Sequence, residues 1–209
     1  MTAWIDDFEG NKLSKKWVAT RISDGGQNDG VYAHEVKNSK VRFTATSQGT
    51  EASYWGEFLK LPINVNAVGN IIVDARIRHK SNGSAGPEGI GIGFNQQGFT
   101  FNVNKGIFVS NNLLELRMTG RDTGAAQPFP ARPAQQTMWL SAIGDAILDV
   151  HIVRKNGRMF VYGNNVYLCS YAYAVALTDV SIVADRYTDR FSSEFYCDFI
   201  RVTPESVVL

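Results

Sequence analysis

The stretch VHIVRKNGRMFVYG, residues Val150–Gly163, decides the fold class of this chain. Its apolar residues recur at every second position on both sides of Asn156-Gly157, which is typical of half-buried β-strands. Asn-Gly between two strands predicts a two-residue hairpin, because both residues tolerate a positive φ. This turn predicts three facing pairs, which are Arg154 with Met159, Ile152 with Val161 and Val150 with Gly163.

A similar turn at Asn164-Asn165 extends the hairpin to a meander and places Val161 opposite Leu168. One face of the meander is aliphatic and predicted to be core: Leu148, Val150, Ile152, Met159, Val161, Val166 and Leu168. The other is aromatic and partly polar: His151, Val153, Phe160, Tyr162, Tyr167, Cys169, Tyr171 and Tyr173. Tyrosine hydroxyls require hydrogen-bond partners, so this second face either binds a ligand or is buried under a loop.

The same two-residue period runs through most of the chain, and no segment predicts a helix of three turns. Further strands are predicted at 31–36, 40–46, 53–61, 71–78, 89–95, 99–104, 106–109, 113–119, 180–185 and 194–203. Many short strands joined by polar turns indicate an all-β antiparallel sandwich of two packed sheets. We expect one domain over residues 1–209, with a long Pro-rich loop at 120–137 that either covers a sandwich edge or binds a partner.

The composition excludes several classes of protein. The chain has 209 residues, a formal net charge of +1 and two cysteines. Nucleic-acid-binding surfaces need clustered Lys and Arg, so a near-neutral charge favours a neutral partner, such as a sugar or another protein surface. No apolar run reaches the ~18 to 20 residues of a membrane helix. Two cysteines form no disulfide framework, and we expect Cys169 and Cys197 to be free, buried thiols.

A set of polar and aromatic side chains on the predicted strands is the candidate ligand-binding site. Asn and Asp offer hydrogen-bond acceptors and donors, glycines such as Gly91 and Gly93 let a ligand approach the backbone, and aromatic planes stack on sugar rings. The candidates are Asp74, Arg76, Asn95, Asn102, Asn104, His151, Tyr162 and Tyr171. The alternative for any one of them is that it lies on the solvated side of a half-buried sheet.

Four segments together resemble the concanavalin A-like lectin/glucanase superfamily, which includes laminin-G-like domains. They are the opening Asp7-Phe8-Glu9-Gly10 with Leu13 and Trp17, the glycine-alternating Gly89–Phe94, the hairpin Val150–Gly163 and the closing Phe195–Val202. The resemblance covers nearly the whole chain and implies a jelly-roll β-sandwich whose closing strand pairs beside the first. Members of the superfamily include enzymes, lectins and virion domains, so the fold alone does not assign a function.

The residues argue against catalysis and leave one metal site open. Laminarinase-like members carry Glu-x-Asp-x-x-Glu on one strand, and this chain lacks that motif, as it lacks the motifs of jelly-roll polysaccharide lyases. The resemblance implies a structural calcium where the first and last strands meet, and Asp7, Glu9 and Asp198 could supply the oxygens. Otherwise Asp7 and Glu9 cap turns or pair with Arg201, and we expect no other cofactor.

The sequence therefore predicts a non-enzymatic, lectin-like domain that binds a glycan or a cell-surface receptor. The alternatives are a structural capsid decoration or tail protein, and a glycoside hydrolase with an atypical carboxylate pair. Residues 1–7 carry no basic stretch followed by an apolar run, so no signal peptide is expected. We accordingly expect a virion surface or an excised extracellular domain, otherwise the cytoplasm, with further copies or other virion proteins as partners.

Overall fold

The structure is a computed structural model, and it describes residues 3–10, 12–23, 30–47, 54–81, 88–95, 106–110, 113–117, 138–139, 146–187 and 193–204. These segments form β-strands and the turns between them. Within these ranges, no helix has the length and hydropathy needed to cross a bilayer.

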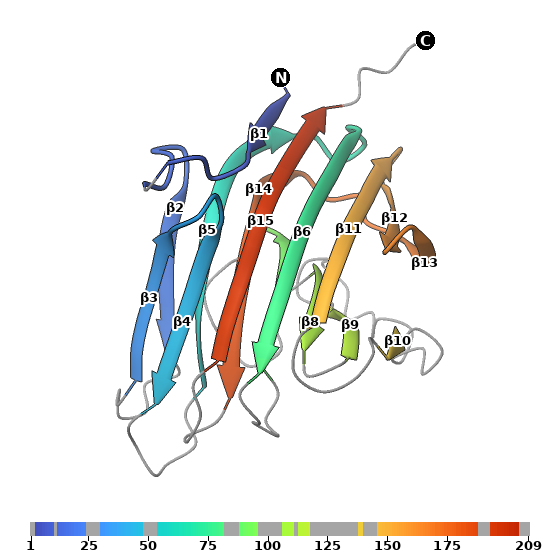
Figure 1. The fold of residues 1–209 in the computed structure, drawn as a ribbon. Coiled ribbons are helices and arrows are strands. Elements are labelled where there is room, and N and C mark those ends of the chain that lie inside the picture. The colour runs from blue at the N-terminus through green and yellow to red at the C-terminus, as the bar shows by residue number, and fades with distance from the viewer. Residues whose placement is uncertain are drawn as a thin grey trace.

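The strands form two antiparallel sheets that pack face to face (Figure 1). The eight-stranded sheet contains β1 (Trp4–Asp6), β3 (Gly30–Val36), β4 (Val41–Ser47), β6 (Ile71–Ser81), β11 (Ala146–Lys155), β12 (Arg158–Gly163), β13 (Val166–Ala172) and β15 (Ser193–Pro204). The seven-stranded sheet contains β2 (Val18–Ser23), β5 (Tyr54–Val65), β7 (Glu88–Phe94), β8 (Gly106–Ser110), β9 (Leu113–Arg117), β10 (Met138–Trp139) and β14 (Leu177–Tyr187). The predicted all-β sandwich is therefore confirmed.

The order of strands within the sheets brings distant parts of the chain together. In the eight-stranded sheet the order is β13-β12-β11-β6-β15-β4-β3, and β1 pairs with β15. The first strand thus lies beside the last, with Trp4 opposite Val202, as the resemblance implied. The seven-stranded sheet has the order β10-β9-β8-β7-β14-β5-β2.

The core lies between the two sheets and follows the predicted alternation. Along β6, Ile71, Val73, Ala75 and Ile77 are all buried, as are Ile90, Ile92 and Phe94 along β7. Residues of the opening motif close one end of this core. Trp17 stacks on Phe8 at 6.3 Å and contacts Trp4 edge-on at 5.1 Å, and its indole Nε1 donates to Asp6 Oδ2 at 2.8 Å.

The hairpin that decides the fold class has the predicted register. Arg154 pairs with Met159, Ile152 with Val161 and Val150 with Gly163. Asn156 and Gly157 have φ values of 50° and 69°, as a tight hairpin turn requires. The second turn also forms, since Asn164 and Asn165 have positive φ.

The predicted register of β13 is wrong beyond its first two residues. Tyr162 pairs with Tyr167 as expected, but a bulge follows, so Val161 pairs with Cys169 rather than Leu168. The extra residue reverses the two faces of the strand from that point. Tyr173, which we expected on the aromatic face, is consequently buried in the core.

Val166 departs from its predicted burial for another reason. It lies opposite Gly163 beside the turn of an edge strand, and it is exposed rather than part of the core.

Cys197 is free and buried, as predicted. Cys169 lies in β13, and β12, β11 and β6 separate it from β15. Neighbouring strands are ~4.8 Å apart, so the two cysteines are separated by roughly 19 Å across the sheet alone. A disulfide requires Cα atoms within about 7 Å. The Cys169 side chain lies outside the described part of the structure.

Candidate functional site

The outer face of the eight-stranded sheet carries a row of four side chains from four adjacent strands. Asp74 on β6 lies opposite His151 on β11, which lies opposite Tyr162 on β12, which lies opposite Tyr167 on β13. Side chains directly opposite each other in an antiparallel sheet share a face and come into contact. We call these four residues the aromatic row.

Within the aromatic row, each side chain touches the next. The Nδ1 atom of His151 lies 2.7 Å from Oδ1 of Asp74. The His151 and Tyr162 ring centroids are 5.4 Å apart at 53°, and those of Tyr162 and Tyr167 are 5.5 Å apart at 65°. These are the tilted and edge-to-face arrangements that aromatic rings prefer. The rings do not form one plane, because each meets the next at an angle.

The aromatic row is open to solvent. Tyr167 is 54% exposed, and the side chains of His151 and Asp74 are 41% and 31% exposed. Because Nδ1 of His151 is held by Asp74, its Nε2 atom is left to face a ligand or water. The row thus combines a carboxylate, an imidazole and two phenols on one accessible surface.

A two-point ion pair lies beside the aromatic row. The Nε and Nη2 atoms of Arg76 donate to the two carboxylate oxygens of Asp149 at 2.6 and 3.0 Å. This hydrogen bonding raises the pKa of Arg76. The turn at Asn164 also binds Asp149. The Asn164 backbone N–H donates to the Asp149 carbonyl and the Asp149 backbone N–H donates to Asn164 Oδ1, both at 2.8 Å. Arg76, a predicted ligand-binding residue, therefore lies next to the row but already binds a carboxylate.

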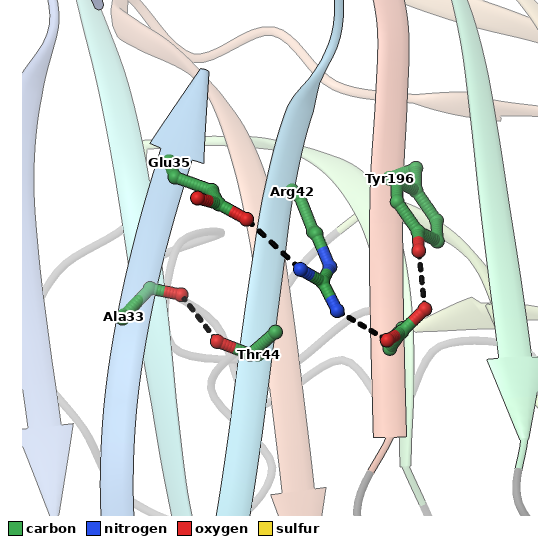
Figure 2. A network of polar contacts seen from close by, with 6 residues as sticks. Ala33, Glu35, Arg42, Thr44 and Tyr196 are labelled. Carbon is green, nitrogen blue, oxygen red and sulfur yellow. Dashed lines mark hydrogen bonds and ion pairs between the residues drawn. The ribbon is translucent and has the colours of Figure 1, made fainter. Parts of the chain in front are cut away.

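A second polar network occupies the other side of the same face (Figure 2). Arg42 on β4 donates to Glu35 on β3 at 2.9 Å and to Glu194 on β15, which also accepts from the Tyr196 hydroxyl. The hydrogen bonds to Glu35 and Glu194 raise the pKa of Arg42.

Tyr196 in this network is also flanked by cations. Lys40 and Arg78 lie 5.8 and 5.9 Å from its ring centroid, and Lys40 pairs with Asp198 at 3.4 Å. The sequence analysis missed this network, because its members come from strands that are distant in the chain and only the sheet order makes them neighbours.

The other predicted ligand-binding residues do not join the aromatic row. Asn95 follows β7 in the seven-stranded sheet and is buried. Its amide donates to the Ala176 carbonyl and accepts from the Thr178 backbone, both at 2.8 Å, so it fastens a turn. Asn102 and Asn104 lie outside the described residues. Tyr171 in β13 was wrongly predicted to lie on the aromatic face, because the bulge sets it opposite the buried Met159 of β12. Its side chain also lies outside the described part.

The predicted calcium ligands lie near the junction of β1 and β15 but have other partners. Asp7 Oδ1 accepts from the backbone N–H of Glu9 at 3.2 Å, and Asp198 pairs with Lys40. The described ranges hold no group of three or more His, Cys, Asp and Glu side chains that could bind a metal ion. A calcium site at Asp7, Glu9 and Asp198 stays a prediction.

Comparisons with known proteins show which solved structures share this fold. No family model and no curated protein matches the sequence. Solved structures match over nearly the whole chain. The carbohydrate recognition domain of Emp47p has a TM-score of 0.61 at 9% identity, covering 98% of this chain and 95% of that one. A structure from work on endo-acting O-glycanases of the human gut microbiota has a TM-score of 0.60 at 9% identity, covering 97% and 99%.

An enzyme gives a similar match. A laminarinase from Flavobacterium sp. UMI-01 has a TM-score of 0.56 at 15% identity, covering 95% of this chain and 98% of that one. The structures that match thus include both a carbohydrate recognition domain and glycan-cleaving enzymes, and identities this low establish the fold alone. The chain has the concanavalin A-like lectin/glucanase fold that its sequence resembles.

Proposed function

We propose that this protein is a non-enzymatic carbohydrate-binding domain that holds a glycan on the aromatic row. The observation that supports the proposal is the register of four strands, which sets Asp74 and His151 beside two accessible tyrosines. Two of these four residues, Asp74 and His151, come from segments that are more than seventy residues apart in the chain.

The chemistry of the aromatic row suits a sugar ring. One side of a pyranose is rich in C–H groups and packs on an aromatic plane such as Tyr167, the most exposed member of the row. Its hydroxyls donate to the Asp74 carboxylate and to Nε2 of His151, and they exchange hydrogen bonds with the tyrosine hydroxyls. Because these groups lie on neighbouring strands of a rigid sheet, they are positioned before the ligand arrives.

Asp74 in the aromatic row and Asp149 beside it are poorly suited to catalyse glycoside hydrolysis. A retaining or inverting hydrolase uses two carboxyl groups, one as acid and one as nucleophile or base, on either side of the scissile bond. Asp74 is hydrogen-bonded to His151, and Asp149 is held at two points by Arg76. Both groups are therefore occupied, and both lie on an open sheet face that water reaches.

A glycan array with the wild type and two variants tests the proposal. We expect the wild type to bind at least one glycan class, and Tyr167→Ala or Tyr162→Ala to weaken that binding by about tenfold, the upper range for one aromatic contact. Val18→Ala is the matched control, because Val18 is an exposed apolar residue on the seven-stranded sheet. Melting curves check that all variants remain folded.

Two results would overturn the proposal. The first is binding that is lost in the control or retained in both tyrosine variants, which would place the ligand elsewhere. The second is the release of new reducing ends from the bound glycan by the wild type, which would make the protein a hydrolase. A protein that binds no glycan but forms stable oligomers would favour the structural role instead.

A further inference from the structure

We infer that the glycan is anionic, and that its negative groups bind to Arg201 at one end of the aromatic row and to Lys155 and Arg158 beside the row. We call these three residues the basic flank. The inference rests on the proposed function and specifies the ligand class for the same face of the eight-stranded sheet. It departs from the neutral partner that the net charge of +1 predicts.

The carboxylates on this face already have hydrogen-bonded or ion-paired neighbours. Asp74 pairs with His151, Asp149 with Arg76 and Asp198 with Lys40. Glu35 and Glu194 both pair with Arg42. Within the described ranges, none of these five carboxylates forms an ion pair with a residue of the basic flank.

The members of the basic flank are exposed. Within the described ranges, Lys155 and Arg201 form no ion pair, and Arg158 donates to the neutral hydroxyl of Ser170 at 3.2 and 3.1 Å. Lys155 and Arg158 lie directly opposite each other on β11 and β12. Like charges in that position repel one another, and an anion bound between them would relieve the repulsion.

The positions of the basic flank match an oligosaccharide rather than a single sugar. Arg201 lies opposite Asp74 and therefore extends the aromatic row by one strand. Lys155 and Arg158 lie four residues further along β11 and β12 than His151 and Tyr162, a distance of ~13 Å along the strands.

The surface between the two cationic positions is apolar. Val153 lies opposite both Ile72 and Phe160 midway between the two rows, and all three side chains are half-buried. A chain of sugar rings can therefore rest on this strip and the tyrosines while its anionic substituents reach Arg201 at one end and Lys155 and Arg158 at the other. Carboxylates and sulfates fit equally, since both accept paired hydrogen bonds from a guanidinium.

Binding to three polymers of different charge tests the inference. The probes are polygalacturonate for carboxylates, dextran sulfate for sulfates and dextran as the neutral reference. We expect at least one anionic polymer to bind about tenfold more tightly than dextran, and to weaken by several fold when the salt concentration rises from roughly 0.05 to 0.3 M. The anionic probe that binds identifies the substituent.

Charge-removing variants locate the contact. We expect Arg201→Gln, and the double variant Lys155→Gln with Arg158→Gln, each to weaken anionic binding by about five- to tenfold. Lys15→Gln removes an exposed cation from the turn before β2 and should change nothing. Equal affinity for dextran, or anionic binding that all these variants retain, would overturn the inference and leave the proposed function standing. Failure of every probe and every arrayed glycan would overturn both.

Discussion

Arg154 and Tyr173 are two polar side chains that are buried at one end of the core. Arg154 is fully buried, and its Nη2 atom donates to the carbonyls of Ala67 and Val175, which belong to two different connections between strands. Burial lowers the pKa of Arg154. Burial also raises the pKa of Tyr173 to about 12, although the charge of Arg154 opposes the shift. The pair holds both connections against the β11–β12 turn, where the Tyr173 backbone N–H donates to Gly157 at 2.7 Å.

Tyr173→Phe should change how stability responds to alkaline pH. The pKa of a free tyrosine is 10.0, so above that pH the unfolded chain ionises Tyr173 while the folded chain keeps it neutral until about pH 12. The stability due to this group is therefore complete below pH 10 and lost between pH 10 and 12. We expect the urea midpoint of the wild type to fall more steeply across this window than that of Tyr173→Phe. Parallel curves for the two proteins would contradict the assignment.

At the scale of single elements, a bulge in β15 changes the face that its side chains occupy. In β15 the register shifts between Cys197 and Phe199, and the Cys197 thiol donates to the Phe199 carbonyl at 3.3 Å. Without the bulge, Phe195 and Phe199 would share a face, because they are four residues apart. With it, Phe195 is buried in the core and Phe199 lies half-buried opposite the exposed Arg76.

Replacing these two phenylalanines tests the effect of the β15 bulge. Phe195→Ala should lower the free energy of unfolding by about 3 to 5 kcal/mol, because it leaves a cavity between the sheets. Phe199→Ala removes the same atoms from the same strand and should cost about 1 kcal/mol, because the outer face leaves no closed cavity. Urea unfolding of the two variants measures the difference. Equal losses would mean that the strand has no such change of face.

At the scale of the whole molecule, burial between the sheets makes Cys197 a reporter of global opening. Its side chain is fully buried, and burial raises the pKa of its thiol well above the ordinary value. A thiol must be both accessible and ionised to react with an alkylating reagent. Opening a strand at the centre of a sheet requires the sandwich to separate.

We therefore expect alkylation at Cys197, followed by mass spectrometry of its peptide, to remain slow in native buffer near pH 8. Labelling should rise with urea in parallel with loss of the folded signal. The same peptide in fully unfolded protein gives the reference rate. Rapid labelling in native buffer would show that β15 opens locally, and would contradict its position between β6 and β4.

Most of the described strands, the tight turns and the core faces of β6, β7, β11 and β12 could be predicted from the sequence alone, whereas the predicted strand at 99–104 lies outside the described residues. These features follow from the alternation of neighbouring residues and from the backbone preferences of Asn and Gly, which are local properties of the chain. β1 was expected only from the family resemblance, and β2 and β10 were not predicted. β1 and β10 have three and two residues, too few for a pattern to repeat.

Which side chains meet depends on the tertiary fold. His151 and Tyr162 share a hairpin and could be paired from the sequence, whereas Asp74 and Arg201 reach the same row through the order of strands in the sheet. Asn95 and Asp74 look equivalent in the sequence but lie in different sheets. Strand order and bulges depend on how the whole molecule buries its apolar area and satisfies its backbone hydrogen bonds. For the same reason, a net charge of +1 did not indicate that Asp149 pairs with Arg76 and Asp74 with His151, while Lys155, Arg158 and Arg201 form no ion pair within the described ranges.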